Sequence, residues 1–302
     1  MPYKRLLALL TALMLLMGLV PAMAEETGEE GENPAQLQLH QITIDCADAY
    51  LLTVGDIAIM IDGGNDTWHR PDKLMDYLRA AGFETLTAYI ITHYHADHDG
   101  NFLLIMSEFG AEDTVVYGPS EALPEKFQPM PCGTYTPMRD GDRFTIGPLS
   151  FHCVGPSTLS AYNGAHNLDS LNFIVTYGAR RFLFTGDYAN SAAFLNQYAD
   201  EVRDIDVLKF PHHGLESPEN RNPFYIAKEA LILCNPSMVL IPGAYAQVKK
   251  YLRSLRLSSV CFGNGDGNFI VFSDGTYLHA VANVQPGQYA GRDVPVEDAT
   301  VK

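Results

Sequence analysis

Four side chains of the kinds that bind metal ions fall within six residues in the first third of the chain. They are His93, His95, Asp97 and His98. Imidazole and carboxylate ligands without a thiolate favour zinc, manganese or iron. Residues two apart in an extended segment point the same way, so His93 and His95 can face one ion, and Asp97 and His98 a second. A chance scatter of surface histidines is the competing interpretation, and the fixed spacing argues against it.

Two further groups follow apolar segments that are expected to be strands. Asp187 comes after residues 182–186, through a glycine, and His212 and His213 come after residues 207–210. Adjacent side chains in an extended chain point in different directions, so we expect one histidine to bind metal and the other to face substrate. The sequence does not decide which. The candidate catalytic residues are Asp97, His212 and His213, each of which is also a candidate metal ligand.

The elements that must position these groups alternate between strands and helices. Residues 88–92 predict a buried strand that runs directly into His93. Residues 71–81 predict a helix, with proline at the first position and Gly82 just beyond the end. Strands gathered toward both ends of residues 37–285, with helices between them, predict one α/β domain of two sheets that are each covered by helices.

The first 24 residues predict a signal peptide. Lys4 and Arg5 precede an apolar stretch, and Ala22-Met23-Ala24 is a small-x-small cleavage site. The alternative is a retained membrane anchor, but the apolar stretch is shorter than the roughly 20 residues that span a bilayer. We therefore expect cleavage after Ala24 and a secreted or extracytoplasmic protein.

The composition excludes several classes of function. The chain has 20 Lys+Arg against 36 Asp+Glu, for a formal charge of −16, and 47% hydrophobic residues. Such a chain is globular, and it lacks the clustered cations of a strong nucleic-acid-binding surface. Residues 25–36 are acidic and predict a disordered leader, and residues 286–302 predict a flexible polar tail.

Together the three clusters resemble the metallo-β-lactamase superfamily. The resemblance implies an αββα sandwich with two divalent metal ions, zinc or manganese, at the strand ends. Its HxHxDH motif matches His93 to His98, its bridging aspartate matches Asp187, and its last histidine matches His212 or His213. Its Asp-Gly-Gly turn, which braces the site from behind the ligands, matches Asp62-Gly63-Gly64.

Two branches of the superfamily share further patterns with this chain. They are the hydrolase domain of bacterial DNA-uptake (competence) channels and the secreted teichoic-acid phosphorylcholine esterases, both of which act on phosphodiesters. The shared patterns are Asp48-Ala49, Asn167-x-x-Ser170-Leu171 and Lys209-Phe210-x-His212-His213. On this resemblance Asn167, like Asp62, is expected to support the ligands rather than to bind metal.

The chain departs from the family at the third histidine of the first metal. His152 and His166 are the candidates, and we favour His166 because it lies in a loop, whereas His152 lies within an expected strand.

The resemblance predicts a phosphodiesterase of the cell envelope or of nucleic acids, in which a metal-bound hydroxide attacks a small or polymeric substrate. The alternatives are a lactone or β-lactam hydrolase and a catalytically weak metal- or ligand-binding module.

Overall fold

The computed structural model describes residues 35–65, 71–156, 166–216 and 224–293. The expected signal peptide lies outside the described residues, as do all but the last two residues of the acidic leader. The described residues belong to one unit, residues 34–302. None of the helices in these ranges is long and apolar enough to cross a membrane.

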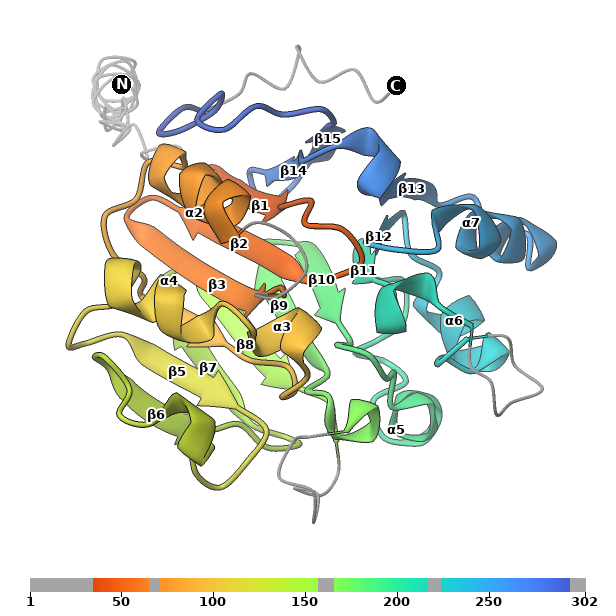
Figure 1. The fold of residues 1–302 in the computed structure, drawn as a ribbon. Helices are drawn as coiled ribbons and strands as arrows, with labels where there is room; N and C mark the ends of the chain where they lie inside the picture. The colour runs from red at the N-terminus through yellow and green to blue at the C-terminus, as the bar shows by residue number, and fades with distance from the viewer. Residues whose placement is uncertain (1–34, 66–70, 157–165, 217–223, 294–302) are drawn as a thin grey trace, which may run out of the picture. The chain divides into compact units, whose positions relative to one another are not determined.

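Two mixed sheets form the centre of the domain (Figure 1). The first has eight strands in the order β15-β14-β1-β2-β3-β4-β5-β6. These are β1 (Leu37–Gln41), β2 (Ala49–Val54), β3 (Ile57–Gly63), β4 (Ala88–Ile90), β5 (Val115–Gly118), β6 (Thr134–Pro137), β14 (Phe269–Ser273) and β15 (Leu278–Val281).

The second sheet has seven strands in the order β13-β12-β11-β10-β9-β8-β7. Its parallel part joins β10, β11, β12 and β13, and its antiparallel part joins β7, β8, β9 and β10. The bounds are β7 (Arg143–Ile146), β8 (Leu149–Cys153), β9 (Phe173–Tyr177), β10 (Arg180–Phe184), β11 (Val207–Lys209), β12 (Met238–Ile241) and β13 (Val260–Gly263).

Helices cover the outer face of each sheet, so the predicted αββα sandwich is confirmed (Figure 1). The first sheet packs against α2 (Pro71–Ala80), α3 (Ala96–Asp99) and α4 (Phe102–Phe109), and the second against α5 (Ser191–Asn196), α6 (Lys228–Cys234) and α7 (Tyr245–Ser254). Short 3-10 helices lie at η1 (Glu125–Phe127), η2 (Asn167–Asp169), η3 (Pro211–Gly214) and η4 (Asn264–Asp266).

The alternation of buried side chains along each strand produces these layers. In β3, Ile59 and Ile61 belong to the core between the sheets, whereas Ala58 and Met60 pack beneath the helices. In β10, Phe182 and Phe184 point between the sheets and Leu183 packs beneath the outer helices. Both faces of these strands are buried, which explains their nearly continuous apolar sequences.

Several elements differ from the sequence-based expectations. The helix predicted for residues 71–81 is confirmed with its end one residue earlier, but α3 and β6 were not predicted. The four-residue α3 falls inside the histidine cluster, where polar side chains give no helical periodicity. Residues 286–293, part of the expected flexible tail, contact β1: the Gln38 side-chain amide donates to the carbonyls of Tyr289 and Arg292.

Candidate metal centre

The candidate residues come together where strands of both sheets end. Asp62 lies at the end of β3, and His93 is the third residue after β4. Asp187 and the His212–His213 pair follow the parallel strands β10 and β11. The carboxyl ends of parallel strands meet at one edge of a sheet, which is where ligand sites form in α/β folds.

Asp187 is the carboxylate on which the centre is built. It is 1% exposed, and its backbone N–H donates to Ser170 Oγ at 3.0 Å. Two groups of potential metal ligands include it: one with Asp48, His98 and His213, the other with His93 and His95. The two Asp187 oxygens face different sides, and each side is described below as one half-site.

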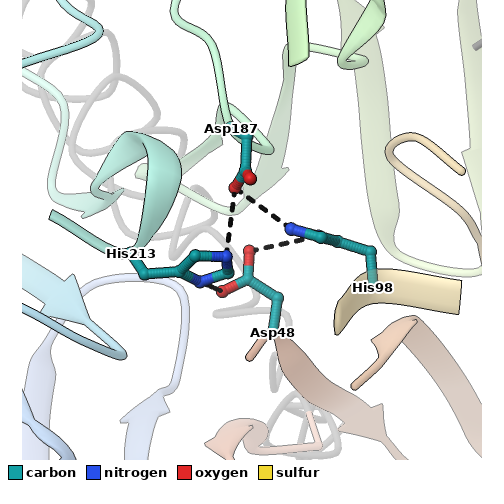
Figure 2. A group of neighbouring side chains, drawn as sticks. All are labelled: Asp48, His98, Asp187 and His213. Carbon is teal, nitrogen blue, oxygen red and sulfur yellow. Dashed lines mark hydrogen bonds and ion pairs between the residues drawn. The ribbon is translucent and has the colours of Figure 1, made fainter. Parts of the chain in front are cut away.

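The Oδ1 half-site consists of Asp187 Oδ1 with His98, His213 and Asp97 (Figure 2 shows its two histidines). His98 Nε2 lies 3.1 Å and His213 Nε2 3.5 Å from Asp187 Oδ1, and His213 Nε2 is also 3.2 Å from Asp97 Oδ2. Both imidazoles are buried, whereas the Asp97 side chain is 33% exposed. These atoms suit one divalent cation.

The Oδ2 half-site consists of Asp187 Oδ2 with His93 and His95. His93 Nε2 lies 3.7 Å from Asp187 Oδ2, and the His93 and His95 rings are in edge-on contact, with centroids 4.6 Å apart. His212 Nε2 lies 3.8 Å from the same oxygen, and its side chain is 22% exposed. Among the described residues, this half-site therefore contains more imidazole and less carboxylate than the other.

Two buried carboxylates orient the rings of the histidines in the Oδ1 half-site. Asp62 Oδ2 lies 2.8 Å from His98 Nδ1, and Asp48 Oδ1 lies 3.1 Å from His213 Nδ1. In both rings Nε2 is left facing Asp187. Asp62 is itself held by the backbone N–H and the hydroxyl of Thr92, at 2.8 and 2.7 Å. Carboxylates of this kind raise the basicity of metal-binding histidines and orient them.

Lys209 places an ammonium group inside the centre. It is 1% exposed, forms an ion pair with Asp48 Oδ2, and donates to the Gly186 carbonyl at 2.6 Å. Its Nζ also lies 3.6 Å from Asp187 Oδ1. Because both oxygens of Asp48 are already engaged, by Lys209 and His213, we assign Asp48 an orienting role rather than that of a ligand.

The charges of the buried groups follow from these contacts. Burial opposes ionisation of Asp187, but the imidazoliums of His98 and His213 hold its pKa well below the ordinary range. Conversely, Asp187, Asp62 and Asp48 overcome burial and raise the pKa of His98 to about 10. His213 has its pKa raised well above its usual value by Asp187 and Asp48, again against burial. Without a metal ion, protons therefore neutralise this half of the centre.

The turn that carries the histidine pair has an unusual backbone. His212, His213 and Gly214 all have positive φ, at 49°, 54° and 78°. A Cβ on Gly214 would approach Val248 to 2.6 Å, so glycine is required there by contact as well as by conformation. Left-handed non-glycine residues cost on the order of 1 kcal/mol each and concentrate at functional sites.

The chemistry of the donor set fits divalent cations. His93 Nε2, His98 Nε2 and Asp187 Oδ1 are buried, yet they make no hydrogen bond within the described residues. His98 Nε2 and Asp187 Oδ1 face each other at 3.1 Å without hydrogen-bond geometry. Buried polar atoms are normally satisfied, and a cation on each side of Asp187 would satisfy these.

Three of the residues singled out in the sequence lie apart from the clustered atoms. His166 is exposed just before η2 and belongs to neither group of ligand atoms found among the described residues. Asn167 makes no described hydrogen bond to the cluster; Ser170, three residues later, contacts Asp187 instead. His152 packs on the outer side of β8 against Tyr198, with ring centroids 5.2 Å apart.

Sequence reasoning did not assign Asp48 or Lys209 to the centre. Both were noted only as parts of a family pattern. The signal that could have found Lys209 is a lysine inside the apolar segment Val207–Phe210, since a buried lysine requires carboxylate partners.

A sequence profile of the Metallo-beta-lactamase superfamily matches residues 47–219, more than half of the chain. The chain therefore belongs to this superfamily of metal-dependent hydrolases, as the motifs predicted.

Relatives with curated names are distant. The lactamase-like protein vrtG of Penicillium aethiopicum is 25% identical over 229 residues, covering 70% of this chain and 66% of vrtG. An atrochrysone carboxyl ACP thioesterase of Aspergillus fumigatus is 24% identical over 196 residues, covering 61% of this chain and 54% of that enzyme. The chain thus spans between about half and two thirds of the length of these two relatives.

Solved structures share the fold. The metallo-beta-lactamase fold protein YhfI from Bacillus subtilis has a TM-score of 0.55 at 17% identity, covering 76% of this chain and 96% of YhfI. CmlA, a diiron beta-hydroxylase from Streptomyces venezuelae, has a TM-score of 0.52 at 13% identity, covering 76% of this chain and 52% of CmlA. At these identities the likeness concerns the fold alone.

Proposed function

We propose that the protein is a two-metal phosphodiesterase. The observation that carries the proposal is the position of Asp187, whose two oxygens face two separate sets of imidazole and carboxylate atoms. Cations held by these two sets of atoms would polarise phosphoryl oxygens and lower the pKa of a bound water. The patterns around Asp48, Asn167 and Lys209 that resemble phosphodiesterase branches of the superfamily support this substrate class.

The protein's own groups divide the remaining tasks. His213 is buried and has its Nδ1 against Asp48, so we assign it as the ligand of the histidine pair. His212 is the partly exposed member, and its ring lies edge-on to Tyr225, with centroids 4.4 Å apart. We assign His212 to contact the substrate. Asp97, also partly exposed, completes the Oδ1 half-site at its open side.

The substrate is proposed to be a cell-envelope phosphodiester, with export directed by residues 1–24. The formal charge of −16 disfavours long nucleic acids, which need cationic tracks beyond the metal centre.

Acyl-bond hydrolysis is the second candidate function. It is favoured by the likeness to a relative named as an ACP thioesterase, and a polarising metal centre serves a thioester or lactone carbonyl as well as a phosphoryl group.

The test is hydrolysis of bis(p-nitrophenyl) phosphate by metal-stripped protein with Mn²⁺ or Zn²⁺ restored. p-Nitrophenyl phosphorylcholine, an acyl thioester and a lactone are assayed alongside. We expect metal-dependent phosphodiester cleavage that is lost in His95→Ala and retained in Asp113→Asn, which changes an exposed carboxylate in a turn. Cleavage of the thioester or lactone without any phosphodiester turnover contradicts the proposal and favours the second candidate.

A further inference from the structure

We infer that the two half-sites bind their cations with unequal affinity: the Oδ1 half-site retains its cation, and the Oδ2 half-site exchanges its own. The inference rests on the two-metal centre of the proposed function. It adds that the resting protein carries one cation at low metal concentration and becomes competent when a second one binds.

Orientation of the ligands differs between the half-sites. Both histidines of the Oδ1 half-site have Nδ1 against a buried aspartate, His98 against Asp62 and His213 against Asp48. In the Oδ2 half-site, His93 Nδ1 lies 3.3 Å from the hydroxyl of Thr92, which carries no charge. A carboxylate behind a histidine ligand typically strengthens metal binding by about 10–100-fold.

Lys209 extends this support to the backbone of the Oδ1 half-site. Its ammonium joins Asp48, which orients His213, to the Gly186 carbonyl, which belongs to the turn presenting Asp187. The Thr185 hydroxyl donates to the Lys209 carbonyl at 2.9 Å, so the ends of β10 and β11 are tied twice. Ligands held in place before a cation arrives need less ordering when it binds.

Charge also favours the Oδ1 half-site. Asp97, Asp62 and Asp48 lie on that side of the centre. Lys209 pairs with Asp48 and also lies 3.6 Å from Asp187 Oδ1, so one ammonium faces several carboxylates. On the other side, Asp187 is the carboxylate that accompanies His93 and His95 in their group of ligand atoms. Once the protons of His98 and His213 have been displaced, the carboxylates of the Oδ1 half-site attract a divalent cation more strongly than the other side does.

The exposure of its side chains also favours faster exchange of the cation in the Oδ2 half-site. His95 is only half-buried, and the partly exposed His212 lies on the same side of Asp187. A cation with fewer charged ligands and a more open approach leaves faster. Hydrolysis that needs both cations should then follow the free metal concentration over the range in which the Oδ2 half-site fills.

The test is titration of metal-free protein with Mn²⁺, with free Mn²⁺ followed by electron paramagnetic resonance. We expect two equivalents whose affinities differ by at least about 100-fold. The partly exposed ligands allow substitutions that leave the core intact: Asp97→Asn should weaken the tight equivalent, and His95→Ala should remove only the weak one. Two indistinguishable equivalents, or loss of the tight one in His95→Ala, overturn the inference.

A second variant tests the cause of the difference. Asp48→Asn keeps an acceptor for His213 but removes the charge, and it should weaken the tight equivalent by about 10–100-fold without changing the weak one. Asp113→Asn is the matched control, and circular dichroism verifies folding. An unchanged tight equivalent in folded Asp48→Asn contradicts the orienting role.

The outcomes separate this inference from the proposed function. Unequal Mn²⁺ binding without phosphodiester cleavage overturns the function and keeps the inference. Phosphodiester cleavage by a protein that binds both Mn²⁺ ions with equal affinity supports the function and overturns the inference.

Discussion

The two half-sites share one carboxylate, yet they differ in charge when no cation is bound. In the Oδ1 half-site, carboxylates overcome burial and raise the pKa of His98 and of His213, so both imidazoles are protonated at neutral pH. In the Oδ2 half-site, burial dominates and holds the pKa of His93 well below its usual value. A histidine in this centre is thus charged or neutral according to the balance between burial, nearby carboxylates and nearby imidazoliums.

The largest effect should come from the residue common to both half-sites. Asp187→Asn removes a charge from each side, and we expect it to lower phosphodiester turnover by about 1,000-fold or more, because neither cation keeps its shared ligand. Metal content and kcat/KM check this, with Asp113→Asn as the control. Loss of only one bound metal ion would show that Asp187 belongs to a single half-site, which contradicts the shared carboxylate.

Replacing Lys209 should lower the free energy of unfolding without changing the fold. Lys209→Met leaves Asp48 buried opposite His213 alone, and losing one partner of a buried ion pair costs about 3–5 kcal/mol in the free energy of unfolding. Urea unfolding of the metal-free variant measures this cost.

The double variant Asp48→Asn with Lys209→Met sharpens the result. It removes both charges, so it should be less destabilised than the sum of the two single variants. Additive effects would mean that the two side chains do not act as a pair.

Asp62 offers a smaller and more local change. Asp62→Asn keeps an oxygen for Thr92 but weakens the hold on His98, and we expect Mn²⁺ affinity of the Oδ1 half-site to fall by about 10–100-fold. Equilibrium dialysis at several metal concentrations gives the affinity of each equivalent. Equal weakening of both equivalents would argue that Asp62 supports the fold in general.

In the metal-free protein, a change of pH should affect the stability contributed by the two half-sites in opposite directions. His98 has its pKa raised from 6.5 to about 10, so its stabilising contribution is complete below pH 6.5 and is lost as the pH rises through 10. His93 has a lowered pKa, so the unfolded chain takes up a proton that the folded chain does not, and stability falls as the pH drops below 6.5.

Urea unfolding between pH 5 and pH 10 checks this opposition. Relative to wild type, His98→Asn should be more destabilising at pH 6 than at pH 10, by about 1 kcal/mol or more. His93→Asn should instead reduce the loss of stability at acid pH. Parallel pH profiles for the two variants would contradict the different charges of the half-sites.

The sequence predicted the fold and most of the centre because the information is local. His93 to His98 lie within six consecutive residues. The apolar segments before Asp187 and His212 mark where two strands end at the edge of a sheet. Periodicity also located α2, because Leu74 and Leu78 share one buried face.

The remainder depends on contacts between distant residues. Asp48 and His213 are 165 residues apart, and nothing in the sequence around either one states that they meet. The different exposure of His212 and His213 likewise depends on the left-handed turn, in which the His213 ring is buried and the His212 ring is partly exposed. A loop position made His166 a candidate, and among the described residues it belongs to neither group of ligand atoms.

The contact of Gln38 with Tyr289 and Arg292 has a practical consequence. β1 runs in the same direction as β3, so Leu37, where β1 begins, lies at the strand ends opposite to Asp62. The contact brings Arg292 to that same edge. A linker, affinity handle or solid support attached at either end of residues 37–293 would therefore hold the protein with its metal centre facing away from the attachment.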